Sequence, residues 1–170
     1  MCHDYGDRDR LDTIDRNTIG HVEERGWSVM HVPEDDLRPG WAFTVGLWHS
    51  HRQPELATFG LDIGTMKACL NVLGRQATDG WPPELDYERS HVIDGDPCCS
   101  RPSNRVGTRR SSVPRSLLPA PADSVRPSPL ADSHQRFPTD PEYEPTARDR
   151  QPSLWLRPDQ HPRGVWTQDL

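Results

Sequence analysis

The sequence lacks the features that mark several large classes of protein. No apolar run approaches the roughly 18 residues that a membrane-spanning helix needs. The charged start MCHDYGDRDR has no apolar stretch of the kind found in secretory signal peptides. Its four cysteines include the adjacent pair Cys98 and Cys99, which does not suit a disulfide framework. These absences predict a reduced, cytoplasmic protein without a membrane segment.

Positive charge is also scarce. The formal net charge is -6, and Lys67 is the only lysine. Binding to nucleic acid or to an anionic membrane surface needs a basic face, so the sequence predicts neither partner. We find no phosphate-binding loop with its lysine, no CxxC pair and no Ser/His/Asp arrangement. We therefore expect no cofactor, and the partner is an unidentified protein or small molecule.

Aromatic residues are missing from one long stretch. Residues 98–135 contain no Phe, Trp or Tyr and consist mainly of Pro, Ser, Arg and Ala, while aromatic residues occur on both sides. A segment of this composition cannot bury enough apolar surface to offset the entropy of ordering it. The sequence thus predicts a disordered segment from about residue 98. It divides the chain into five parts: a flexible N-terminus (1–8), a folded domain (9–96), a disordered segment (97–135), an extended C-terminal segment (136–156) and a flexible tail (157–170).

The region before residue 97 has the patterns of regular secondary structure. Apolar residues recur at helical spacing in 11–25, and Gly26 follows as a typical helix end. Three strands are expected at 27–32, 41–48 and 55–61, with a polar loop before the third. Asp62 can cap a second helix, whose apolar stripe is Ile63, Met66, Leu70, Leu73 and Ala77. Residues 81–90 are expected to form a loop and 91–93 to begin a strand. The prediction is an α+β fold with a small antiparallel sheet and two helices.

Several short motifs occur in an order that resembles a known bacterial family. They are Gly26-Trp27, then Trp41-Ala42-Phe43-Thr44-Val45-Gly46-Leu47, then Pro54-Glu55-Leu56, Gly60-Leu61 and Leu70-Asn71. On these motifs residues 9–96 resemble the domain of unknown function DUF4262. The resemblance resumes weakly over 136–156, at Phe137-Pro138 and Gln151-Pro152. It implies no established activity.

The resemblance also implies two elements that the written sequence does not contain. The family pattern continues with a helix rich in aromatic residues and a strand similar to FVQVLWP, and residues 98–135 occupy their place. Back-translated with GC-rich codons and read two bases out of phase, residues 98–116 give LFAPVEPGWYEALFGAAL. Residues 117–131 read one base out of phase give FYRRPPIPFVQVLWP. The sequence therefore suggests that single-base insertions or deletions near residues 97, 116 and 134 put this segment out of frame.

Glu55 is the first candidate for a functional side chain. A carboxylate at the start of a buried strand can act as a general base, with Thr44 and Asn71 lining a pocket beside it. The same carboxylate can instead accept backbone hydrogen bonds from the adjacent loop, and this structural role is the favoured interpretation. A small hydrolase-like enzyme that uses Glu55 with Thr44, Asn71 or the loop histidines is the alternative function.

His49 and His51, with Glu55 nearby, are the candidates for metal binding. Imidazole and carboxylate groups suit zinc or iron. Side chains two residues apart on an extended loop diverge, however, and no third ligand is evident, so a solvated loop is the favoured interpretation. Because no convergent set of catalytic residues stands out, the sequence favours a binding or interaction module over an enzyme.

Overall fold

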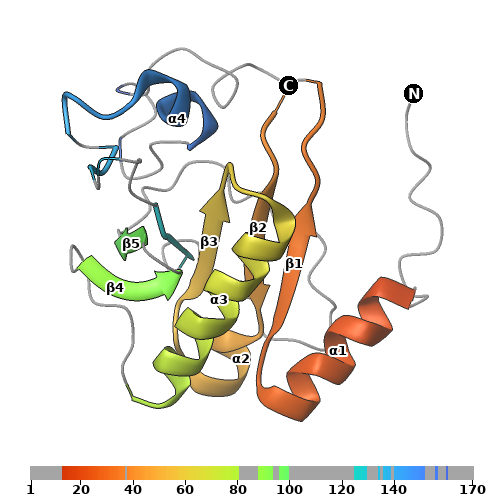
Figure 1. Ribbon diagram of the computed structural model, residues 1–170. Coiled ribbons are helices and arrows are strands. Elements are labelled where there is room, and N and C mark those ends of the chain that lie inside the picture. The colour runs from red at the N-terminus through yellow and green to blue at the C-terminus, as the bar shows by residue number, and fades with distance from the viewer. Residues whose placement is uncertain are drawn as a thin grey trace.

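The computed structural model describes residues 13–36, 38–80, 88–93, 96–99, 125–129, 134, 136–138, 140–151, 156 and 160. Ten elements occur in this part of the chain (Figure 1). They are α1 (Thr13–Arg25), β1 (Ser28–Val32), β2 (Trp41–Val45), α2 (Leu47–His51), β3 (Glu55–Phe59), α3 (Ile63–Thr78), β4 (Glu88–Ile93), β5 (Asp96–Cys99), β6 (Val125–Pro127) and α4 (Pro145–Arg150).

The main sheet has the strand order β1-β2-β3-β6. The first three strands form an antiparallel meander, in which Ser28 lies opposite Val45 and Trp41 lies opposite Phe59. β6 joins the outer edge of β3 in the parallel direction. A separate two-stranded antiparallel sheet consists of β4 and β5. The predicted α+β fold with a small antiparallel sheet is confirmed, and β6 extends that sheet.

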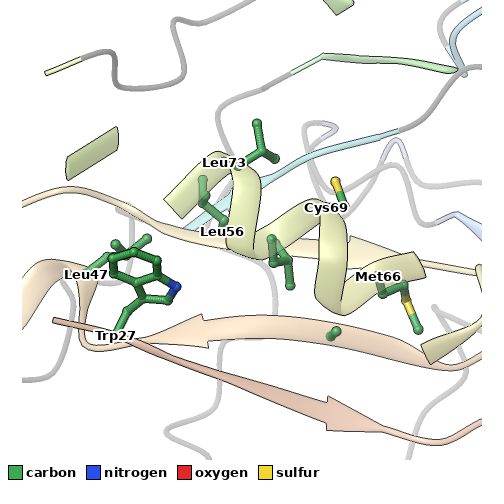
Figure 2. Packing of buried hydrophobic residues seen from close by; sticks show 8 residues of the cluster. Trp27, Leu47, Leu56, Met66, Cys69 and Leu73 are labelled. Carbon is green, nitrogen blue, oxygen red and sulfur yellow. The ribbon is translucent and has the colours of Figure 1, made fainter. Parts of the chain in front are cut away.

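α3 covers one face of the sheet, as Figure 1 shows. Side chains of its apolar stripe pack with Trp27, just before β1, and with residues from β2, β3 and α2 in one buried cluster (Figure 2). The cluster consists of Trp27, Ala42, Leu47, Leu56, Met66, Cys69, Leu70 and Leu73. A Cβ atom on Gly74 would lie 2.9 Å from the indole of Trp27, so glycine at this position lets the helix approach the ring closely.

α1 packs on the opposite face of the same strands. Successive side chains of a strand point to opposite faces, so Val45 faces away from the cluster that contains Ala42. Val45 packs with Val22 of α1, and the half-buried Met30 and Phe43 complete this smaller cluster. The helix ends where Gly26 adopts a φ of 91°, a left-handed conformation that glycine adopts without strain.

The structure differs from the expected elements in several places. β5 reaches into the segment 97–135 that was expected to be disordered, and β6 lies within it, while most of that segment is outside the described residues. Residues 47–51 form the short helix α2, where the end of a strand and a polar loop were expected. β4 begins at Glu88, inside the expected loop, and α4 interrupts the segment 136–156 that was expected to be extended. Before α2, Gly46, with a φ of 107°, turns the chain out of β2 and into the helix. Because only glycine adopts this φ readily, it ends the strand earlier than the alternation of residues suggests.

The C-terminal segment contains buried side chains and is bonded to the loops beside β1 and β3 through Arg150. Phe137, Tyr143 and Gln151 are buried, and Gln151 donates a hydrogen bond to the Tyr143 hydroxyl over 2.9 Å. Arg150 donates from Nε to the Gly60 carbonyl over 2.9 Å and forms an ion pair with Glu34 at 3.2 Å. Over the residues described here, no helix is both long and apolar enough to cross a membrane.

Candidate functional site

Glu55 lies at the start of β3 and accepts three hydrogen bonds from within the protein. The Thr44 hydroxyl donates to Oε2 over 2.7 Å. The backbone N–H groups of Gly46 and Trp48 each donate to Oε1 over 3.0 Å. Only 8% of the residue is exposed, so these donors replace the water that an exposed carboxylate would bind.

The position of Glu55 follows from the short connection between β2 and β3. α2 begins directly after β2, and its first N–H groups have no partners within the helix. Gly46, which precedes the helix, has no side chain to cap it. The Glu55 carboxylate supplies the missing acceptor, and its negative charge is favourable beside the positive end of the helix dipole. Glu55 thus ties together β2, α2 and β3.

Burial raises the pKa of Glu55 above its ordinary value of 4.5. Desolvation is the dominant cause, and the hydrogen bonds from Thr44, Trp48 and Gly46 act in the opposite direction. A carboxyl group with a raised pKa can exchange a proton closer to neutral pH. This electrostatic property is shared by general bases and by structural carboxylates in buried positions.

Thr44 connects the two strands that meet at this carboxylate. Its hydroxyl donates to Glu55 and also accepts the backbone N–H of Leu56 over 2.8 Å. Thr58, two residues further along β3, presents a contrast, because its buried hydroxyl has no hydrogen-bond partner. The hydroxyl of Ser128, just after β6, is likewise buried without one.

The other candidates from the sequence occupy different places. His49 and His51 lie on α2, at helical positions two residues apart, rather than on the loop that was expected. His51 packs beside Gly26, where a Cβ atom would meet its imidazole ring. Asn71 is half-buried on α3, and it is not among the donors to Glu55. Among the residues that the structure describes, no group of three His, Cys, Asp or Glu side chains is placed to hold a metal ion.

Two polar pairs between α1 and β1 and the backbone donors to Glu55 were not predicted from the sequence. The N–H groups of Gly46 and Trp48 carry no side-chain signal, although a glycine directly after a strand could have indicated the turn into a helix. His21 Nδ1 lies 3.2 Å from the buried hydroxyl of Ser28. The Thr18 hydroxyl lies 3.3 Å from the sulfur of Met30. Both pairs join α1 to β1.

An apolar surface lies at the end of the sheet away from Glu55. Val32, the last residue of β1, is 40% exposed and lies opposite Trp41. The Trp41 ring stacks on Phe43 at 4.8 Å and on Phe59 at 5.8 Å between ring centroids. Trp41 and Phe43 are only half-buried. We refer to Val32, Trp41, Phe43 and Phe59 as the aromatic surface.

The chain matches a protein family over most of its length. The family described as "Domain of unknown function (DUF4262)" matches residues 21–144, which include both Glu55 and the aromatic surface. No curated protein and no solved structure matches the chain. The match extends across residues 98–135 as well as the motifs before them.

Proposed function

This chain belongs to the DUF4262 family, and from that premise we propose that it is a binding module that recognises an apolar segment of a partner protein. The description of the family names no activity, so the proposal depends on the surface of the chain itself. It includes a bacterial, cytoplasmic setting and a partner that is neither nucleic acid nor membrane, in keeping with the net charge of -6.

The observation that carries the proposal is the aromatic surface. Val32 is 40% exposed at its strand end, and the half-buried rings of Trp41 and Phe43 lie beside it, so these three side chains leave apolar area in contact with water, whereas Phe59, which stacks on Trp41, is only 8% exposed. Exposed apolar groups that gather in one place are typical of interaction sites. Aromatic side chains are also enriched among the residues that contribute most to binding.

The geometry around Glu55 supports the same conclusion. Its two carboxylate oxygens accept three internal hydrogen bonds, and these bonds hold the turn between β2 and β3 in place. A residue engaged in this way has an evident structural role. The binding surface then lies at the other end of these strands.

A selection from a random peptide library tests the proposal. Wild-type protein is compared with Val32→Lys, which places a charge on the aromatic surface, and with Ala68→Lys, which places the same charge on an exposed position of α3. We expect wild-type and Ala68→Lys to enrich the same peptides and Val32→Lys to lose them. Equal enrichment by all three proteins would show that the aromatic surface is not the binding site. Circular dichroism checks that each variant is folded.

The alternative is a small hydrolase-like enzyme in which Glu55 acts as a general base, with Thr44, Asn71 or the histidines of α2. The raised pKa of Glu55 is the observation that favours it. A thermal-shift screen against metals, nucleotides and small metabolites distinguishes the two functions. Strong stabilisation by one small ligand, lost in Glu55→Gln, would support the enzyme and count against a pure interaction module.

We also propose that residues 98–135 are encoded out of frame. In the alternative frame of residues 117–131, the phenylalanine of FVQVLWP falls at position 125, where β6 begins. β6 pairs in parallel with β3, which is buried along its whole length. A strand that lies parallel beside a fully buried strand normally consists of apolar residues. The written strand instead contains Pro127, which has no N–H to donate. Resequencing the gene tests this: codons that are incompatible with the shifted frame would contradict it.

A further inference from the structure

Among the described strands, the main sheet has two edges, β1 and β6. β6 carries Pro127, which has no N–H to donate, so β1 is the edge considered for pairing. Edge strands are usually protected from pairing by a lysine, a proline, a bulge or an inward-pointing charge. The five residues of β1, SVMHV, include none of these groups. The register between β1 and β2 runs without interruption from Ser28 opposite Val45 to Val32 opposite Trp41, so no bulge twists the edge away. Among the residues that the structure describes, no strand pairs with the outer edge of β1, so this edge is suited to accept another strand.

α1 covers one face of β1. Its polar contacts with the strand are made to the side chains of Ser28 and Met30, which point to the same face. In Figure 1 α1 meets the start of β1 and diverges from the strand toward its own N-terminal end. The part of β1 that ends at Val32 lies beside the aromatic surface, so an added strand would place alternate side chains against Val32 and Trp41.

The charges at both ends of β1 are predominantly acidic. Glu23 and Glu24 are exposed before the strand, and Glu34, Asp35 and Asp36 are exposed after it. The arginines nearby are Arg25, Arg38 and Arg150, the last of which pairs with Glu34. An antiparallel second copy of β1 would bring the start of one strand against the end of the other, and acidic groups would then face each other. A basic segment is the complementary occupant.

We propose that a partner segment with alternating apolar residues and basic flanks binds as an added strand along the outer edge of β1. This inference rests on the proposed function and names the partner and the mode of binding. Backbone hydrogen bonds supply affinity in such complexes, and the alternate side chains supply specificity. Here the apolar side chains contact Val32 and Trp41, and the basic flanks face the acidic groups at the two ends of β1.

Fluorescence anisotropy with defined peptides tests the proposal. The probe is a fluorescein-labelled peptide. In its centre three valines alternate with three threonines, and a pair of lysines flanks this centre at each end. One control peptide has glutamates in place of the lysines, and the other has N-methylated backbone amides at alternate positions. We expect the lysine peptide to bind at least roughly tenfold more tightly than either control, and raised salt to weaken its binding. Equal binding of all three peptides would overturn the proposal.

Protein variants and hydrogen exchange locate the binding site. Val32→Lys should lose roughly tenfold or more in affinity for the lysine peptide, and Ala68→Lys should retain its affinity. In the wild-type protein the peptide should slow amide exchange in β1 and leave α3 unchanged. Slowed exchange confined to α3, or none at all, would contradict binding along β1, and this result does not depend on any variant folding.

Three outcomes separate strand addition along β1 from the proposed function as a binding module. The first is measured by sedimentation equilibrium. A wild-type dimer that Val32→Lys dissociates would identify a second copy as the occupant and overturn the inference. If library peptides depend on Val32 but do not protect the amides of β1, the binding module stands and strand addition fails. If neither library peptides nor the lysine peptide bind, both proposals fail.

Discussion

Thr44 and Thr58 lie on neighbouring strands of one sheet, and their hydroxyls have opposite energetic roles. Thr44 makes two short hydrogen bonds, to the Glu55 carboxylate and from the Leu56 N–H. Thr58 is completely buried, and its hydroxyl makes none. A buried hydroxyl without a hydrogen-bond partner lowers the stability of the fold. Removing a hydroxyl that is hydrogen-bonded to another buried polar group is also destabilising, because it leaves that group without a partner.

The substitution of each threonine by valine should therefore have opposite effects. Thr44→Val is expected to lower the free energy of unfolding by about 2–3 kcal/mol, because Glu55 and Leu56 each lose a partner. Valine has nearly the same size and shape as threonine, so Thr58→Val should leave the free energy of unfolding unchanged or raise it by about 1 kcal/mol. Urea unfolding measures both. Equal losses in the two variants would show that Thr58 has a hydrogen bond in solution.

Glu55 should make stability depend on pH. Its pKa is raised in the folded state above the ordinary 4.5, so the folded protein holds this proton to a higher pH than the unfolded chain does. The contribution of Glu55 is fully present below about pH 4.5 and is lost as the pH rises through the raised value. Unfolding of wild-type and Glu55→Gln over a pH series should show the wild-type losing stability relative to the variant as the pH rises. The reverse trend would mean that its hydrogen bonds outweigh its burial.

At the scale of elements, α3 offers the clearest test of a helix cap. Asp62 accepts the Thr65 N–H over 3.0 Å. The hydrogen bond with the Thr65 side chain is the largest cause that holds the pKa of Asp62 below its ordinary 3.8, and the bond from the Thr65 N–H is the next. The stability from this cap is present above about pH 3.8 and is lost as the pH falls through the lowered value. Asp62→Ser should retain much of the cap without that titration, and Asp62→Ala should lose both. Thermal unfolding between neutral and acidic pH compares the stability of the wild-type protein and the two variants. If all three proteins lose stability equally in acid, Asp62 does not act as a titrating helix cap.

The sequence predicted those elements whose signal is local and repeated. The stripe from Ile63 to Ala77 and the cap at Asp62 define α3 without reference to the rest of the chain. α2 could not be found in the same way, because it depends on a carboxylate that arrives from Glu55, after the helix. The sequence suggested Thr44 and Asn71 as neighbours of Glu55 in a pocket; Thr44 donates a hydrogen bond to Glu55, and Asn71 is not among its donors. The donors at Gly46 and Trp48 were not, since backbone groups leave no pattern in a sequence.

For the molecule as a whole, the proposed change of frame has a direct consequence for stability. β3 has apolar or buried residues on both faces and needs a matching neighbour on its outer edge. The buried Ser128 without a partner and the proline in β6 are poor replacements for an apolar strand. A chain in which residues 98–134 carry the alternative frame should melt at least about 5 °C higher, which corresponds to roughly 1–2 kcal/mol. Differential scanning calorimetry of both chains measures this, and a lower melting temperature for the corrected chain would contradict the proposal.

The bonds of Arg150 have a consequence for how the protein is made. This side chain joins Gly60, 90 residues earlier, and Glu34, 116 residues earlier in the chain. During synthesis β1, β2, β3 and α3 emerge from the ribosome long before Arg150 does. Contacts between residues so far apart in the chain also form slowly. The nascent domain therefore passes through a period in which its C-terminal contacts are missing, and it then depends on chaperones more than a domain closed by local contacts would.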